Sequence, residues 1–433
     1  MHRRAVLKTL TGTAFAAPLA GTVLRSAPAA ASSAATATAS GDPFSALLEA
    51  EHAAGMPGTF ALIREGGRTH LPAAGVNRPG LADYEHRVGG ITKSFTGATV
   101  LSLVGEGLID LDTPIGRYLP GLLTDGRGSQ TTVRMLLNHT SGIQDFMVIN
   151  LADGAAPPPA DVLFTSLDGI ADTATRTYSP RELLRIGLSL PPLGPPGSVW
   201  SYASTNYVIL GLLIEKTTGR SYEEEVTRRV LGPLDLRGSY LPGGRRRLRG
   251  RHLEAYIPWA GASLRDFTTY DMSWAWASCD LVSTARDLNT FYRALLGGRL
   301  LPSALLAEMK TTVPMAPAFP QYAGYGLGIF WTSGPCGPTW GHDGLVVGHS
   351  AYSLHAEDGV SLQVTQMENL NFYESAAQRR QGANPIDAAR ARFHGAVLAG
   401  ACAPAASAAV GAGPAANTMS AVAHPRTLMA LRR

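Results

Sequence analysis

The segment RVGGITKSFTG occupies residues 87–97 and opens the stretch of sequence that decides the fold. From Phe95 within it, apolar or small residues recur at helical spacing, at Ala98, Leu101 and Val104. A buried helix is therefore expected over residues 91–107, ending at the glycines that flank Glu106. Because residues three apart share one face of a helix, Lys93 and position 90 are expected to point the same way.

Two further short motifs carry polar residues suited to chemistry. Tyr202-Ala203-Ser204 stands just before a helical pattern over residues 206–218, about a hundred residues after the first segment. His342-Asp343-Gly344 stands among strand-like runs near the C-terminal end. A single Lys, Tyr or His is far more often a surface or core residue than a catalyst. The occurrence of all three in this order outweighs that simpler interpretation.

In this order, the three motifs resemble the signatures of the penicillin-recognising serine hydrolases, the family of class C β-lactamases and DD-carboxypeptidases. That family opens a buried helix with Ser-x-x-Lys, and the resemblance assigns the nucleophile's position to Gly90 and the base to Lys93. It makes Tyr202 the proton relay and His342 the start of the [His/Lys]-x-Gly motif. It implies contacts with substrate at Ser204, Asp343, Gly344 and Leu345, and places oxyanion donors at the Gly90 and Leu345 amides.

The resemblance runs from about residue 42 to 402 and includes LNHTSG at 137–142 and Gly-Leu-Gly at 326–328. It implies an α+β fold of the β-lactamase/transpeptidase type, with an antiparallel sheet flanked by helices and a helical subdomain. At 433 residues, the chain exceeds the roughly 250 to 300 at which single cores stop growing, so two subdomains are expected. We expect an α/β subdomain from residues 42–95 and 280–402, and a mainly helical one from 96–279.

Local patterns predict the other elements. A helix is expected over residues 42–54, followed by a strand at 59–64 that Gly66-Gly67 turns into a second strand. Further helices are expected after the capping residue Ser179 and over residues 206–218, 285–296 and 386–399. Further strands are expected over residues 326–332, 346–355 and 360–367.

Gly90 departs from the family pattern, because glycine has no hydroxyl to attack a carbonyl. Loss of a catalytic serine typically costs about a million-fold in turnover. Ser94, one helical turn further on, is one candidate to replace the missing nucleophile. A water held by Lys93 and Tyr202 is a second candidate. A third explanation is that a serine at position 90 was deliberately replaced. Two classes of function therefore stay open: a serine-hydrolase homologue impaired in acyl-enzyme formation, and a non-catalytic protein that binds D-Ala-D-Ala-like peptides or β-lactams.

The N-terminus predicts export. Arg3-Arg4 followed by an apolar stretch over residues 9–24 is typical of a twin-arginine signal, and alanines 27, 29 and 31 offer cleavage sites. We expect a signal over residues 1–31, a linker over 32–41, a disordered tail over 403–433 and an extracytoplasmic location. An uncleaved membrane anchor is the second interpretation. No other segment offers about 18 uninterrupted apolar residues, so no stable membrane insertion is expected after signal removal.

Composition and cysteine usage narrow the partners. The formal charge of +4 is concentrated in short arginine runs without interleaved aromatics, so nucleic-acid binding is not expected. We expect a monomer that takes a small-molecule or peptide substrate and needs no cofactor or metal. His139 and His349 are interpreted as a turn and a strand-edge residue.

Of three cysteines, Cys336 and Cys402 are expected to pair, where the family's Gram-positive carboxypeptidases also bridge, and Cys279 to stay a buried thiol.

Overall fold

The computed structural model describes residues 42–147, 162–164, 167–259, 263–315, 322–371 and 384–400. The expected signal, linker and C-terminal tail lie outside the described residues, so these expectations stay predictions. Within the described ranges, no helix combines the length and apolar character needed to cross a membrane.

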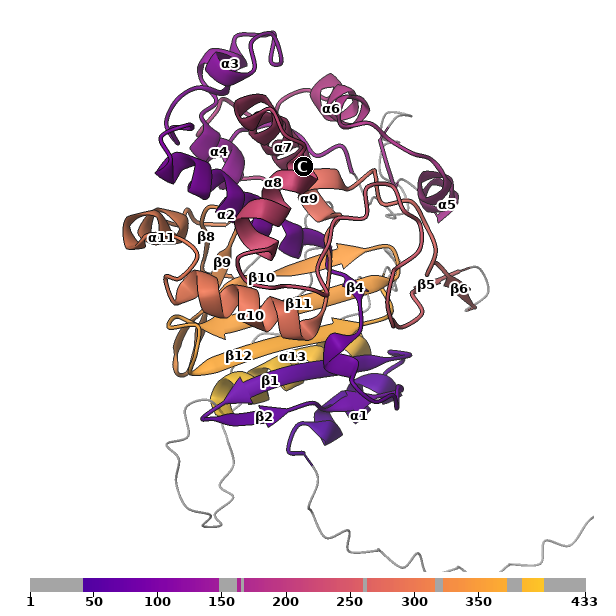
Figure 1. Ribbon diagram of the computed structural model, residues 1–433. Coiled ribbons are helices and arrows are strands. Elements are labelled where there is room, and N and C mark those ends of the chain that lie inside the picture. Colours follow the sequence, from indigo (N-terminus) through magenta and orange to yellow (C-terminus); the bar gives the residue numbers. More distant parts are fainter. Residues whose placement is uncertain are drawn as a thin grey trace, which may run out of the picture. The chain divides into compact units, whose positions relative to one another are not determined.

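An eight-stranded antiparallel sheet forms the centre of the fold (Figure 1). Its strands follow the order β2-β1-β12-β11-β10-β9-β8, and β3 pairs with β1. Two-stranded pairs β4-β7 and β5-β6 lie outside it. The strands are β1 Thr59–Glu65, β2 Arg68–His70, β3 Ala73–Ala74, β4 His86–Arg87, β5 Tyr256–Pro258, β6 Leu264–Asp266, β7 Val282–Ser283, β8 Gly324–Tyr325, β9 Phe330–Gly334, β10 Gly337–Val346, β11 His349–Ala356 and β12 Leu362–Glu368.

Helices surround the sheet, and most of them come from the sequence between β4 and β8. They are α1 Ser45–Ala53, α2 Thr92–Gly105, α3 Ile115–Tyr118, α4 Val133–Leu137, α5 Leu167–Thr175, α6 Pro180–Ser189, α7 Ser204–Thr218, α8 Tyr222–Val226, α9 Trp276–Cys279, α10 Ala285–Leu296, α11 Ser303–Lys310 and α13 Pro385–Gly400. Short 3-10 turns occupy Leu81–Asp83, Gly89–Ile91 and Arg127–Ser129, and a π-helical turn, Thr227–Leu231, follows α8.

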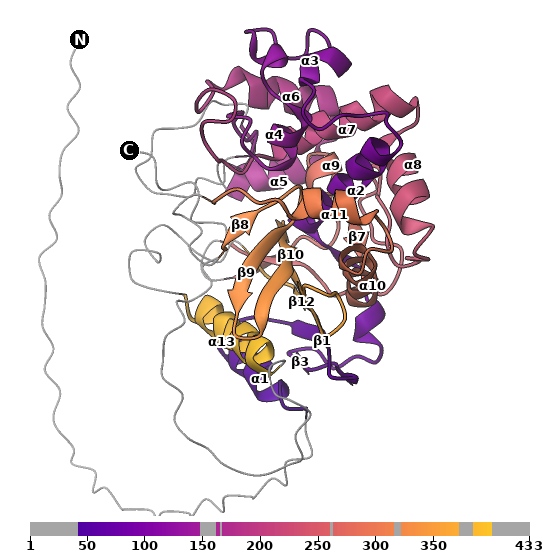
Figure 2. The ribbon, with the colours of Figure 1, turned by 90° about the vertical axis from the view of Figure 1, so that its left-hand side faces the viewer.

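The alternation of apolar residues along β1 explains the layers. Ala61 and Ile63 face a core with α1 and α13, whereas Phe60 and Leu62 face a larger core that includes α10. Figure 2 shows α1 and α13 side by side on one side of the sheet and α10 on the other. The sheet is thus covered on both faces, as the α+β prediction requires.

Several predicted elements match closely because their capping residues are explicit in the sequence. The Thr284 hydroxyl accepts a hydrogen bond from the Asp287 amide at the start of α10, and Ser179 forms a capping box with Glu182 at the start of α6. Gly219 ends α7 with a left-handed φ of 69°. Helices α1, α2, α7, α10 and α13 all begin and end within a few residues of their predicted bounds.

Two predicted strands are wrong in their extent. Residues 326–332 do not form one strand, because a turn at Gly328 (φ 90°) precedes β9, and the Gly326 amide donates to the Ile329 carbonyl. Residues 346–355 also span a break, since Val346 ends β10, Gly348 (φ 76°) turns the chain and β11 begins at His349. The boundaries of the two subdomains stay a prediction.

Candidate active site

Two closely packed backbone segments form the base of the site. The turn Gly89–Ile91 leads into α2, and it lies against Gly344 and Leu345 of β10. A Cβ at Gly89 (φ 54°) would lie 2.5 Å from the Leu345 nitrogen, and one at Gly344 would lie 1.8 Å from the Val88 carbonyl oxygen. Only glycine allows this approach. The Gly90 and Leu345 amides, assigned as oxyanion donors by the family resemblance, therefore belong to segments in direct contact.

Lys93 lies in the first turn of α2 with its side chain fully buried. Its ammonium nitrogen donates a hydrogen bond to the Ser278 carbonyl oxygen (3.1 Å) and lies 3.5 Å from the Cys279 sulfur. It also lies 4.6 Å from the centre of the Tyr202 ring. The amine is therefore held by a carbonyl, a thiol and an aromatic face.

Tyr202 points its hydroxyl at position 90. A Cβ built on Gly90 would lie 2.9 Å from the Tyr202 hydroxyl oxygen, 3.1 Å from His342 Cε1 and 2.8 Å from the Asp343 carbonyl oxygen. Burial raises the pKa of Tyr202 well above its ordinary value, so the phenol keeps its proton near neutral pH. The structure thus brings three of the sequence-predicted residues around position 90, where glycine offers no side chain.

His342 is a neutral imidazole in this environment. Burial, followed by the nearby charge of Lys93, lowers its pKa to about 3. Its Nδ1 lies 2.5 Å from the Asp343 carbonyl oxygen, which can only accept a hydrogen bond, so Nδ1 carries the proton. Nε2 is then the acceptor for the Tyr325 hydroxyl at 2.9 Å. His342 is therefore fixed in one tautomer and one orientation.

Two carboxyls add acidic character to the site, that of Asp343, which is buried, and that of Asp145, which is half-buried. The Asp145 carboxylate accepts a hydrogen bond from the Ser204 amide (3.0 Å) at the start of α7, and Asp343 accepts one from the Tyr322 hydroxyl (2.7 Å). Burial raises the pKa of each carboxyl to about 6, although the charge of Lys93 opposes the shift. Both groups are ionised above that pH and protonated below it.

Ser94 has other partners. Its hydroxyl donates to the Gly328 carbonyl oxygen (2.7 Å) and lies 2.9 Å from the Tyr292 hydroxyl. Tyr292 lies on α10, whose Phe291 stacks on Phe95 of α2, Gly328 lies in the turn against the Lys93 carbonyl, and the serine is fully buried. These contacts assign Ser94 a structural role and argue against its acting as the missing nucleophile.

A model of the family described as Beta-lactamase matches residues 44–380. This chain belongs to that family. Penicillin-binding protein 4 of Amycolatopsis lactamdurans is 29% identical over 328 residues, which cover 71% of this chain and 79% of that protein. D-aminopeptidase of Cereibacter sphaeroides strain KD131 is 25% identical over 62% of this chain, and the match spans only 47% of that enzyme.

Solved structures of other proteins show the same fold. A D-stereospecific amidohydrolase from Streptomyces sp. has a TM-score of 0.68 and 35% sequence identity, over 78% of this chain and 96% of that one. D-amino acid amidase from Ochrobactrum anthropi SV3, complexed with L-phenylalanine amide, has a TM-score of 0.65 over 81% of this chain and 98% of that one. At 24% identity, the second likeness shows the fold alone.

Within this family fold, the sequence interpretation missed residues that support the site from a distance. His139 is a turn residue, as predicted, with a φ of 64°, but it is also buried against the Tyr202 ring at 4.4 Å. Its Nδ1 accepts a hydrogen bond from the Ala203 amide (3.2 Å). Asp145 and Tyr325 were missed entirely, because no local motif ties them to the three signatures. His349 begins β11 and packs on His86.

The cysteines are described only in part. Cys279 is a free, buried thiol, as predicted. The Cys336 sulfur lies 3.1 Å from the Leu398 carbonyl oxygen near the end of α13. Cys402 lies outside the described residues, so its pairing with Cys336 stays a prediction.

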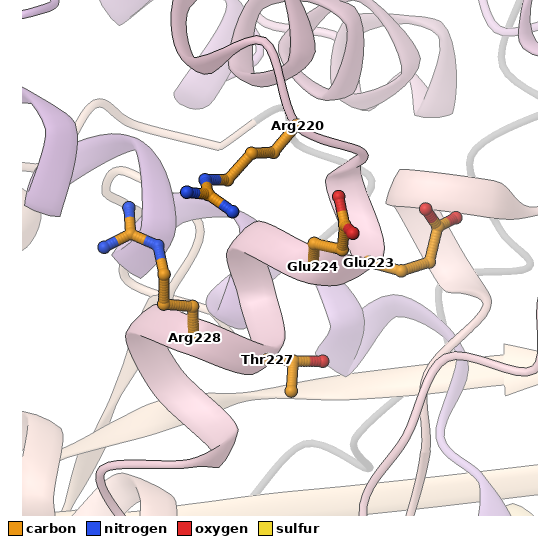
Figure 3. A pocket seen from close by; sticks show the side chains of 5 residues that line it. All are labelled: Arg220, Glu223, Glu224, Thr227 and Arg228. Carbon is orange, nitrogen blue, oxygen red and sulfur yellow. The ribbon is translucent and has the colours of Figure 1, made fainter.

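A separate pocket of about 330 Å³ lies on α8, and none of the predicted site residues lines it (Figure 3). Its lining is charged, and Arg220 and Arg228 both contact the buried carboxylate of Glu225, at 3.6 and 2.9 Å. The arginine charges are therefore partly compensated from within the protein. We assign this pocket no role in the chemistry of the family.

Proposed function

We propose that this chain is an exported member of the Beta-lactamase family that binds D-Ala-D-Ala-like peptides or β-lactams without forming an acyl-enzyme. The observation that carries the proposal is the arrangement around position 90. The Tyr202 hydroxyl and His342 surround the point where a Gly90 Cβ would lie, and Lys93 is one helical turn away. The groups that would activate a nucleophile are present, and the nucleophile is not.

The relatives support the ligand class. Similar proteins are named penicillin-binding protein, D-aminopeptidase and D-stereospecific amidohydrolase. The first name refers to a β-lactam ligand, and the other two refer to substrates with D-configured carbon atoms. Each kind of ligand carries a carbonyl group. The amides of Gly90 and Leu345 are backbone groups that the loss of a side chain does not remove, so they remain available to bind such a carbonyl. Binding can therefore outlast the loss of acyl transfer.

The competing function is residual hydrolysis through a bound water. Lys93 and Tyr202 would orient the water, and the product would leave without any covalent intermediate. This alternative predicts slow turnover with no adduct. Binding alone predicts neither turnover nor adduct, so the two functions separate in one set of measurements.

The test compares the native chain, Gly90→Ser, and Gly90→Ser combined with Lys93→Ala. Mass spectrometry after incubation with benzylpenicillin is expected to show an adduct only for Gly90→Ser. Calorimetry of the native chain with an N-acylated D-Ala-D-Ala dipeptide is expected to show reversible binding, and the L-Ala-L-Ala isomer serves as the control. An adduct on the native chain, turnover of the dipeptide, or equal affinity for the two isomers would each overturn the proposal.

A further inference from the structure

Cys279 and Lys93 form a pair of potential nucleophiles that the proposed function does not use together. The sulfur of Cys279 lies 3.5 Å from the ammonium nitrogen of Lys93. Cys279 is the last residue of α9, a helix that packs against α2 and against the turn before it. Lys93 is fully buried and Cys279 is 5% exposed. The contact is therefore a packed feature of the core beside position 90.

The amine is the nucleophile within reach of this sulfur. An oxidised thiol of the sulfenic acid type condenses either with a second thiol or with a nitrogen. Cys336 lies in the turn between β9 and β10, against Leu398 of α13. The group that contacts the Cys279 sulfur is the Lys93 nitrogen. Lys93 carries its nitrogen on a flexible four-carbon stem, which allows the remaining gap to close.

We propose that Cys279 is a site of peroxide modification and that Lys93 traps the oxidised sulfur in a reversible sulfenyl amide cross-link. In the first step, the Cys279 sulfur attacks hydrogen peroxide and the O–O bond breaks. One oxygen stays on sulfur as the sulfenic acid, and the other leaves as water with the thiol proton. Sulfur is oxidised by two electrons and the peroxide is reduced.

In the second step, the ammonium group of Lys93 gives up one proton to solvent, and the resulting neutral amine attacks the sulfenic sulfur. An N–S bond forms, the S–O bond breaks, and the hydroxide leaves as water after taking a proton from the amine. The protein has then lost two hydrogens in total. Two equivalents of a small thiol reverse the change, because they restore the amine and the Cys279 thiol and are themselves oxidised to a disulfide.

The cross-link removes the cation from the site. The charge of Lys93 lowers the pKa of Asp145 and of Asp343, and it lowers that of His342. Without this charge, the two carboxyls hold their protons more tightly. Exposure to peroxide would therefore change the charge around Gly90 through the loss of the Lys93 cation.

The experiment uses the full chain, needs no ligand, and is independent of the proposed function. The protein is exposed to graded hydrogen peroxide, alkylated without reduction and digested, and its peptides are identified by mass spectrometry. We expect a peptide containing Lys93 joined to one containing Cys279, with a mass equal to their sum less two hydrogens. Dithiothreitol is expected to separate them.

Two variants provide the controls. Cys279→Ser is expected to give no linked peptide. Lys93→Arg keeps a cation but lacks the amine, so Cys279 is expected to stay at the sulfenic acid and to react with dimedone several-fold more than in the native chain. If a variant fails to fold, the presence or absence of the linked peptide in the native chain still tests the cross-link.

Three results would overturn the inference. Oxidation of Cys279 to sulfenic or sulfinic acid with no linked peptide would show that Lys93 does not trap the sulfur. An additional oxygen in the linked peptide would show an N–O–S bridge instead of a sulfenyl amide. A Cys279 thiol that stays reduced while methionines of the chain are oxidised would show that the site is not reached by peroxide.

Discussion

Adding a methyl group at Gly90 tests how tightly the protein closes around this position. In Gly90→Ala, the new Cβ would lie 2.8 Å from the Asp343 carbonyl oxygen, whereas its contacts with Tyr202 at 2.9 Å and His342 at 3.1 Å involve the ends of side chains. The Asp343 oxygen belongs to β10, so relief requires a shift of the strand. Overpacking of this kind costs about 1 to 3 kcal/mol, and we expect a loss of that size in the free energy of unfolding.

Two other glycines calibrate the measurement. Gly66 has a φ of 52° and no atom within 4 Å of an added Cβ, so Gly66→Ala reports the cost of the backbone conformation alone, about 1 to 2 kcal/mol. Gly89 combines a φ of 54° with a Cβ contact of 2.5 Å to the Leu345 nitrogen, so Gly89→Ala is expected to cost more than either of the other variants.

Urea unfolding followed by tryptophan fluorescence compares the three variants with the native chain. We expect the largest loss in the free energy of unfolding for Gly89→Ala and smaller losses for Gly90→Ala and Gly66→Ala. A Gly90→Ala protein that unfolds within about 0.5 kcal/mol of the native chain would refute the close contact with Asp343. Equal losses for Gly89→Ala and Gly66→Ala would refute the close approach of the two backbone segments.

Two predictions concern the groups around this site and the C-terminal helix. Burial raises the pKa of Asp343 from 3.8 to about 6, so the folded state holds the proton more tightly and stability falls as the pH rises from about 4 to about 6, then levels off. Asp343→Asn is expected to remove the contribution of this carboxyl to the fall in stability, roughly 2 to 3 kcal/mol at most. Urea unfolding of the native chain and the variant at pH 4 and pH 8 measures this difference. An equal fall in both proteins would contradict the raised pKa of Asp343. Cys336 and Cys402 are expected to be joined, so a non-reducing peptide map should contain the linked peptides, and Cys336→Ser with Cys402→Ser should lose about 2 to 4 kcal/mol of stability. Two separately alkylated cysteines in that map would exclude the bridge.

Local sequence signals were sufficient for elements whose ends are marked by capping residues. Thr284 and Ser179 precede α10 and α6, and their hydroxyls accept hydrogen bonds from free amides of the first turn. Gly219 ends α7 because glycine readily adopts a left-handed conformation. The strand predicted over residues 326–332 failed for the opposite reason. Gly328 has a φ of 90°, and a Cβ there would lie 2.7 Å from the Lys93 carbonyl oxygen. The turn at Gly328 therefore packs closely against α2, a contact between distant segments that no local pattern encodes.

The same limit applies to the site. Lys93, Tyr202 and His342 could be selected because each lies in a short motif and the motifs occur in a fixed order. Asp145 could not, since its link to the site is a hydrogen bond from the Ser204 amide that exists only after the chain folds. Tyr325, which fixes the orientation of His342, was missed for the same reason. The pKa shifts follow from burial, which the motifs do not report.

Gly90 differs from its neighbour Gly89 in what the backbone requires. Gly89 has a left-handed φ and faces backbone atoms of β10, so no other residue fits without strain. The φ of Gly90 lies outside the left-handed region, so an L-residue is compatible with its backbone. What opposes a side chain at Gly90 is the position of the Asp343 carbonyl and the Tyr202 hydroxyl. A serine there would therefore restore the nucleophile only by displacing part of β10, and we expect Gly90→Ser to gain acylation and lose stability together. Acylation with unchanged stability would show that β10 moves freely, and lost stability without acylation would show that the site has diverged beyond this residue.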